Sequence, residues 1–139
     1  MTTSTPTTVE SLYVVDTHAL IWYLLGDTKL SQRALALFQA AESGETRLIV
    51  PAIVLAELYF ANEKHKWFAD YRIVYEDIVS KDIFRFLPLN HHDVLDFEQD
   101  SPVPEMHDRM IVGVARRLNA PLITSDPLIV RADIVRVEW

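Results

Sequence analysis

The chain has 139 residues, enough for one domain with a sizeable buried core, and its hydrophobic share of 50% and charged share of 24% are ordinary for a globular protein. It has no cysteine, which excludes thiol catalysis, thiolate metal sites and disulfides, and its few glycines form neither a P-loop nor a GxGxxG motif for nucleotide phosphates. The net charge of −7 counts against nucleic-acid binding, because contacts to phosphates need cations.

Residues 1–10 are rich in threonine and lack both the basic start and the apolar stretch of a signal peptide. We expect a disordered tail there, followed by a single domain over residues 11–139. The longest apolar run, residues 19–25, is too short to cross a bilayer. Together with the absence of cysteine, these features predict a cytoplasmic protein.

Short apolar runs rich in β-branched residues alternate along the chain with segments of helical periodicity. Ser31 is a good helix N-cap, Gly26 and Gly44 lie where helices should end, and Pro51 suits the first turn of a helix. The predicted order is strand 12–15, helix 17–25, helix 31–41, strand 47–50, helix 51–64, helix 70–79, strand 83–87, short helix 90–97, helix 107–118, strand 121–124 and strand 134–137.

This alternation predicts an α/β sandwich with a central, mostly parallel sheet of about five strands flanked by helices. In such a sheet, ligands bind beyond the carboxyl ends of the strands. Asp16 directly follows the first predicted strand, and Asp126 comes just after the fourth. We therefore expect these two carboxylates at the same edge of the sheet.

Two further acids interrupt apolar helices. The neighbours of Glu57 three and four residues away are all apolar: Ile53, Val54, Phe60 and Ala61. Burying an ionised carboxylate there costs several kcal/mol unless a metal, a cationic side chain or a shifted pKa compensates it. Asp108 opens the helix 107–118, where an acid also serves simply to complement the helix dipole.

The four acids make a stronger signal together than singly. Two carboxylates about 4 Å apart repel by about 4 kcal/mol at an effective dielectric near 20, and no lysine or arginine is buried in these segments to offset that. Mg²⁺ and Mn²⁺ take oxygen ligands, and two such ions suit in-line phosphodiester cleavage. We predict that Asp16 and Asp108 bind metal directly and that Glu57 and Asp126 complete the site, directly or through water.

Other side chains are weaker candidates. Thr17 and Thr124 could orient an acid or a water, although strand-end hydroxyls often bond only locally. Lys64 and Lys66, beside Trp67, could bind a nucleic acid by charge and stacking, or form a solvated helix end. For Arg109, pairing with a neighbouring acid is slightly favoured over contact with a substrate. The aromatic residues are expected to lie mostly in the core, with some left for a partner surface: Trp22, Tyr23, Tyr59, Phe60 and Phe68.

Four blocks resemble the PIN-domain ribonucleases. Residues 14–21 (VVDTHALI) are similar to the opening strand, where Thr or Ser follows the first acid, and Glu57 within Ala-Glu-Leu is similar to the second acid. Residues 107–115 (HDRMIVGVA) resemble the third block, and residues 122–126 (LITSD) resemble the fourth. The order and spacing extend the resemblance over nearly the whole chain, from about residue 12 to 137.

The length and the Asp-Arg block look most like VapC-like toxins of type II toxin–antitoxin systems. That resemblance implies a PIN-like sandwich, a Mg²⁺- or Mn²⁺-dependent endoribonuclease acting on structured RNA, a homodimer, and an antitoxin partner that covers the acidic cleft. The chain departs from many relatives in being less basic.

Other classes of protein fit less well. A phosphatase with an aspartyl nucleophile needs a second acid two residues after Asp16, where His18 stands, and a receiver domain needs an acidic pair before the first strand's acid and a late lysine, both missing. An RNA-processing enzyme or a catalytically silent binding module on the same fold stays open as an alternative.

Overall fold

The computed structural model describes residues 11–139, so the predicted disordered tail lies outside the described residues. Within that range, five strands form one parallel sheet of order β3-β2-β1-β4-β5. The strands are β1 (Ser11–Val15), β2 (Thr46–Pro51), β3 (Phe84–Leu87), β4 (Leu122–Ile123) and β5 (Val137–Glu138). The predicted α/β sandwich with a central sheet of about five strands is confirmed, and every strand pair is parallel.

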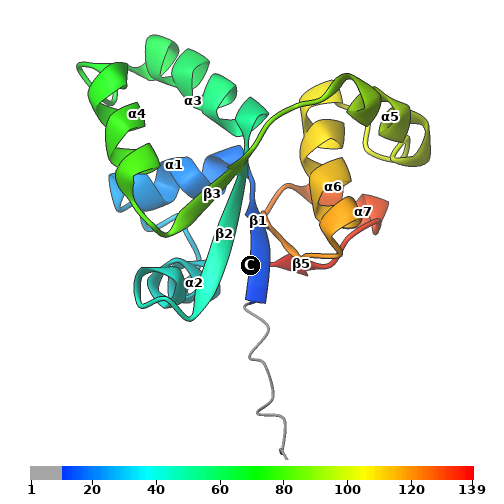
Figure 1. Ribbon diagram of the computed structural model, residues 1–139, viewed down its shortest axis with the longest axis horizontal. Helices are drawn as coiled ribbons and strands as arrows, with labels where there is room; N and C mark the ends of the chain where they lie inside the picture. Colours follow the sequence, from blue (N-terminus) through cyan, green and yellow to red (C-terminus); the bar gives the residue numbers. More distant parts are fainter. Residues whose placement is uncertain (1–10) are drawn as a thin grey trace, which may run out of the picture.

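Helices cover both faces of the sheet. Figure 1 shows α1 to α4 on one side and α5 to α7 on the other. The helical segments are α1 (Thr17–Leu25), α2 (Gln32–Glu42), α3 (Ala52–His65), α4 (Tyr71–Ser80), the 3₁₀ turn η1 (His91–Leu95), α5 (Asp96–Gln99), α6 (Met106–Leu118) and α7 (Pro127–Ala132). None of the helices within residues 11–139 is both long enough and apolar enough to cross a membrane.

Local signals in the sequence set most helix ends. The Ser31 hydroxyl accepts a hydrogen bond from the Ala34 amide and so caps α2, and Gly26 ends α1 in the left-handed conformation with φ of 63°. The Asp70 carboxylate caps α4. These observed caps explain why the predicted boundaries of the longer helices fall within one or two residues of the real ones.

Two predictions about the elements were wrong in detail. The segment predicted as one short helix over 90–97 is a 3₁₀ turn followed by the short helix α5. The helix α7 is missing from the predicted elements because six residues are too few to show a helical period. Its signal was the Asp126-Pro127 pair, in which the acid caps the Leu128 amide at 2.8 Å and the proline occupies the first turn.

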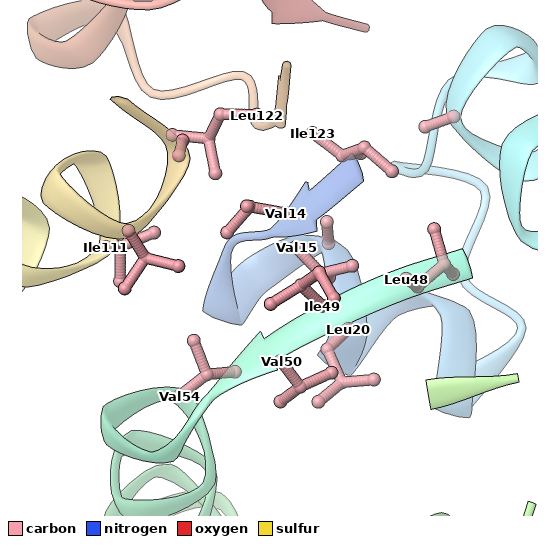
Figure 2. Packing of buried hydrophobic residues seen from close by; sticks show 14 of the residues in the cluster. Val14, Val15, Leu20, Leu48, Ile49, Val50, Val54, Ile111, Leu122 and Ile123 are labelled. Atoms are coloured by element: carbon pink, nitrogen blue, oxygen red, sulfur yellow. The ribbon is translucent and has the colours of Figure 1, made fainter. Parts of the chain in front are cut away.

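The core lies between the sheet and its helices. The central strands β1, β2 and β4 carry fully buried β-branched and leucine side chains, because both faces of a parallel sheet are covered. Figure 2 shows Val14 and Val15 of β1 close to Ile49, Leu122 and Ile111. This packing fixes the end of β1, from which Asp16 emerges.

Two of the aromatic side chains predicted to lie mostly in the core do not. Phe60 is 70% exposed and Tyr59 is 41% exposed. The buried face of α3 carries Val54 and Leu58, and a residue two positions further points to the opposite side of the helix. The exposed pair is left on the outer surface of the molecule, whereas Trp22 and Tyr23 pack against the core.

An ion-pair network joins α5 to α6. The carboxylate of Asp100 is fully buried and accepts two hydrogen bonds from Arg116, at 2.9 and 3.2 Å. Arg116 also pairs with Asp96 at 2.8 Å, and Arg117 contacts the same acid. Gly113 lies beside the network, since an added Cβ would come within 3.3 Å of an oxygen of Asp100.

We expect Arg116→Met to lower the free energy of unfolding by about 3 kcal/mol, because it leaves the carboxylate of Asp100 buried without the guanidinium that donates two hydrogen bonds to it. Arg117→Met removes a more exposed cation and should cost about 1 kcal/mol or less. Urea unfolding of both variants measures the difference. Equal losses would show that the burial of Asp100 does not control stability.

Candidate active site

The four predicted acids come from four separate segments that meet at the carboxyl edge of the sheet. Asp16 follows β1 and is the N-cap of α1, and Asp126 follows β4 and is the N-cap of α7. Glu57 lies on α3 and Asp108 in the first turn of α6, and these two helices contact each other. Since β1 lies between β2 and β4, the strand order reverses between β1 and β4, which is where parallel sheets of this kind bind ligands.

Hydrogen bonds from two threonines connect three of the acids. The backbone amide of Thr17 donates to Asp16 Oδ1 at 2.7 Å, and its hydroxyl donates to Glu57 Oε1 at 2.6 Å. The hydroxyl of Thr124 donates to Asp16 Oδ2 at 2.6 Å and accepts from the Asp126 amide at 3.1 Å. Both hydroxyls thus bond to candidate site acids, and both oxygens of the buried Asp16 are engaged.

The carboxylate of Asp108 stands apart from this network. No hydrogen bond or ion pair joins its side chain to another group within residues 11–139, although its amide is capped by Glu105 at 2.8 Å. Burial, and to a smaller extent the charges of Asp16, Asp126, Glu105 and Glu57, together raise the pKa of Asp108 to about 7. Asp108 thus lies near the other three predicted acids, and its side chain is the one least held by other groups.

Burial is also the main cause of the shifts at two other acids. It raises the pKa of Asp16, although the hydrogen bonds from Thr124 and Thr17 act in the opposite direction. It raises the pKa of Glu57 as well, and the hydrogen bond from Thr17 again opposes the shift. Across residues 11–139, no lysine or arginine forms an ion pair with any of the four predicted acids.

Two neighbours of the acids were not predicted from the sequence. Glu105 is the N-cap of α6 and adds a fifth carboxylate beside Asp108. His107 lies with Nδ1 3.3 Å from Glu105 and 3.7 Å from Glu57. The acid three residues before Asp108 was a readable capping signal, but the approach of His107 to Glu57 depends on how α6 crosses α3.

The donor set fits a divalent cation by its chemistry. Carboxylate oxygens are the ligands that Mg²⁺ and Mn²⁺ prefer, and a bound cation would offset the negative charge of the neighbouring acids around Asp108. In this conformation, however, no three of the His, Asp or Glu side chains within residues 11–139 are arranged to hold one ion. Metal binding therefore requires side-chain adjustment, with Asp108 the acid least restrained by other bonds.

Among residues 11–139, Arg109 forms no ion pair with an acid, so the slightly favoured prediction for this residue was wrong. Its guanidinium donates to the backbone carbonyls of Val103, of Phe97 at 3.2 Å and of Ser101 at 3.2 Å. These bonds hold the segment between α5 and α6 against the helix that carries Asp108. A guanidinium carries five N–H donors, so one side chain can bond several carbonyls of a segment rich in turns.

Comparison with known proteins agrees with this architecture. The sequence matches the PIN domain family over residues 13–135, so the chain belongs to the PIN domain family. Among curated proteins, none matches the sequence.

Solved structures with the same fold include three protein complexes. VapBC from Salmonella typhimurium bound to DNA aligns with a TM-score of 0.68 and 20% identity, covering 91% of this chain and 96% of the other. VapBC2 from Rickettsia felis bound to a DNA fragment from the promoter aligns with a TM-score of 0.65 and 16% identity, covering 91% of this chain and 96% of the other. FitAcB from Neisseria gonorrhoeae aligns with a TM-score of 0.64 and 18% identity, covering 90% of this chain and 95% of the other. The predicted resemblance to VapC-like PIN proteins is thus confirmed in family and fold.

Proposed function

We propose that the protein is a Mg²⁺- or Mn²⁺-dependent endoribonuclease, a phosphodiester hydrolase that acts as the toxin of a type II toxin–antitoxin pair in the cytoplasm. The observation that carries the proposal is the gathering of Asp16, Glu57, Asp108 and Asp126 from four segments at one sheet edge, with no lysine or arginine paired to them within residues 11–139. Membership of the PIN domain family supports a nuclease.

The four acids have two kinds of part in the proposed site. Asp108 and Asp16 would hold the cation directly, and Glu57 and Asp126 would complete the site directly or through water. Thr17 and Thr124 keep the carboxylates of Asp16 and Glu57 oriented through their short hydrogen bonds. When bound, the cation supplies activation of a water for attack on phosphorus and offsets charge on the phosphate oxygens. No nucleophilic side chain is needed.

The C-terminal end of α3 would contact the RNA backbone. Lys64 follows Glu57 by two helical turns, so it lies on nearly the same face of α3 and about 10 Å further along the axis. Lys66 is exposed and only loosely paired with Glu63, at 3.8 Å. The rings of His65 and Trp67 stack at 4.6 Å beside them. This segment, residues 64–67, concentrates positive charge in an otherwise acidic chain.

Replacing Lys64 and Lys66 by alanine together should raise KM for RNA several-fold at low salt without changing kcat, because phosphate contacts act on binding. Removing one phosphate contact reduces the slope of log affinity against log salt by about 0.7 for single-stranded RNA. The charge-matched control, Lys29→Ala with Lys81→Ala, should leave both quantities unchanged. If the double variant keeps the wild-type slope of log affinity against log salt, Lys64 and Lys66 do not contact the RNA. Arg109, whose donors are occupied by carbonyls, is assigned to loop positioning instead.

An antitoxin protein and a second copy of the chain are the proposed partners. The structural neighbours are VapBC and FitAcB complexes, which supports a protein partner. Exposed apolar side chains on α3 and α4 offer a surface for one: Tyr59, Phe60, Ile73, Tyr75 and Val79. Size-exclusion chromatography with light scattering, on the chain alone and with the product of an adjacent small gene, tests both partners.

The test of the proposed function is cleavage of total tRNA and rRNA by the purified, partner-free protein with Mn²⁺, with Mg²⁺ and with EDTA. Discrete fragments that disappear in EDTA would support the nuclease and reveal its target. A folded protein that cuts nothing yet gains thermal stability from Mn²⁺ would favour a catalytically silent binding module or a narrower RNA-processing role. Cleavage that persists in EDTA would overturn the metal site.

A further inference from the structure

A shallow pocket of about 280 Å³ lies next to the acidic site, at the point where α1 and α7 begin. Three of its lining residues also belong to the acidic network: Asp16, Thr124 and Asp126. The proposed mechanism assigns no part to the remaining lining residues: His18, Ala19, Trp22, Ser125 and Pro127. The pocket therefore connects directly to the position where a phosphate would meet the acids.

Two of these remaining residues are aromatic, His18 and Trp22. His18 is exposed in the first turn of α1, and its ring lies 5.7 Å from that of Trp22, one helical turn further on. Trp22 is half-buried, and the ring of Trp139 meets its ring edge-on with the centroids 5.7 Å apart. An exposed imidazole and a half-buried indole thus line the same pocket as two of the candidate site acids.

We propose that this pocket, lined by His18, Trp22, Ser125 and Pro127, binds an unstacked base of the nucleotide next to the cleaved phosphodiester bond and so sets the sequence preference of the enzyme. The inference rests on the proposed ribonuclease function. It assigns to the pocket a single base of single-stranded or looped RNA.

The side chains of His18, Trp22 and Ser125 match a nucleobase better than other parts of RNA. Bases that are splayed out of a loop stack on aromatic side chains, including histidine and tryptophan, and hydrogen-bond along their edges. The imidazole nitrogens of His18 and the exposed hydroxyl of Ser125 supply such edge contacts. No lysine or arginine that could bind a phosphate is among the residues that line this pocket. The volume is below the usual range for drug-sized ligands, which suits one base and not a longer segment.

Because Asp16 and Asp126 belong to both the pocket and the acidic site, a base bound here holds the adjoining phosphate close to the acids. Sequence preference and the position of the cut would then come from the same contact. This explains how an acidic chain can select an RNA without a broad basic groove: the base contributes binding that does not depend on phosphate charge.

The test has two arms, applied to the wild type, His18→Ala, Trp22→Leu and the control His91→Ala. His18 and His91 are both exposed, so neither substitution removes core packing. In the first arm, the protein without metal is titrated with each of the four nucleosides, and with ribose as a control, while the indole and imidazole signals are followed by NMR. Trp22→Leu identifies the indole signal of Trp22.

We expect saturable shifts at His18 and Trp22 with at least one nucleoside and none with ribose. These shifts should disappear in His18→Ala and persist in His91→Ala. This arm needs neither metal nor cleavage. It therefore tests whether the pocket binds a base even if the protein cuts no RNA and the proposed function fails. No shift at either residue with any nucleoside would overturn the proposal.

In the second arm, single-turnover cleavage is measured on RNA that carries an abasic nucleotide on one side or the other of the cut bond. One abasic position should slow the wild type by about ten-fold, as removal of one base–aromatic stack does, and should slow His18→Ala no further. An abasic effect of equal size in the wild type and in His18→Ala would also overturn the pocket, while the ribonuclease function would stand.

Discussion

Asp16→Asn is expected to reduce RNA cleavage by at least about 100-fold, because even groups that only support a metal ligand cost about 10- to 100-fold when removed. The substitution removes the charge but preserves the shape. The amide oxygen of an asparagine can still accept from the Thr17 amide, and its NH₂ group can face the Thr124 hydroxyl. The variant should therefore fold normally, and its thermal unfolding in the absence of metal checks that it does.

Asp133→Asn is the matched control. Asp133 is an exposed residue that ends α7 in the left-handed conformation with φ of 52°, which asparagine also adopts readily. Cleavage should be unchanged in this variant. If Asp16→Asn cuts as fast as the wild type and as Asp133→Asn, the activity belongs to a contaminant or to another part of the chain, and the assignment of Asp16 is wrong.

The second large effect concerns Asp108 and pH. Burial and the surrounding carboxylates raise its pKa from 3.8 to about 7, so the folded protein favours the protonated form. The stabilisation by this protonated form is fully present below pH 3.8 and is lost as the pH rises through 7. Because the side chain is half exposed, solvent screening limits the loss to about 2 kcal/mol. The raised pKa values of Asp16 and Glu57 act in the same direction.

We expect the metal-free protein to be more stable at pH 5 than at pH 8, and Asp108→Asn to flatten that dependence and to be the more stable protein at pH 8. Denaturant unfolding across this range, in EDTA, measures both effects. Adding Mn²⁺ at pH 8 should then stabilise the wild type, by about 2.7 kcal/mol at one hundred times the dissociation constant, and stabilise Asp108→Asn much less. Identical pH profiles for the two proteins would show that burial and the neighbouring carboxylates do not raise the pKa of Asp108.

The sequence alone determined the class of fold and the candidate acids. The alternation of β-branched runs with helical periods is a local property, so it predicted the parallel sheet and most helix boundaries. Asp16 and Asp126 could be assigned to one edge because every parallel strand ends there. Glu57 was detectable because a carboxylate among apolar neighbours on one helix is unusual.

Tertiary structure decided what local patterns do not record. The order of the strands places β1 beside β4, and only that neighbourhood brings Thr124 to Asp16 and forms the pocket beside His18 and Trp22. The crossing of α3 with α6 brings His107 to Glu57 and leaves Phe60 outside, against the expectation for an aromatic residue. Arg109 found backbone carbonyls instead of an acid. Each of these contacts joins residues that are distant in sequence or on different elements, and their energies depend on packing and burial, which a single sequence specifies only through the completed fold.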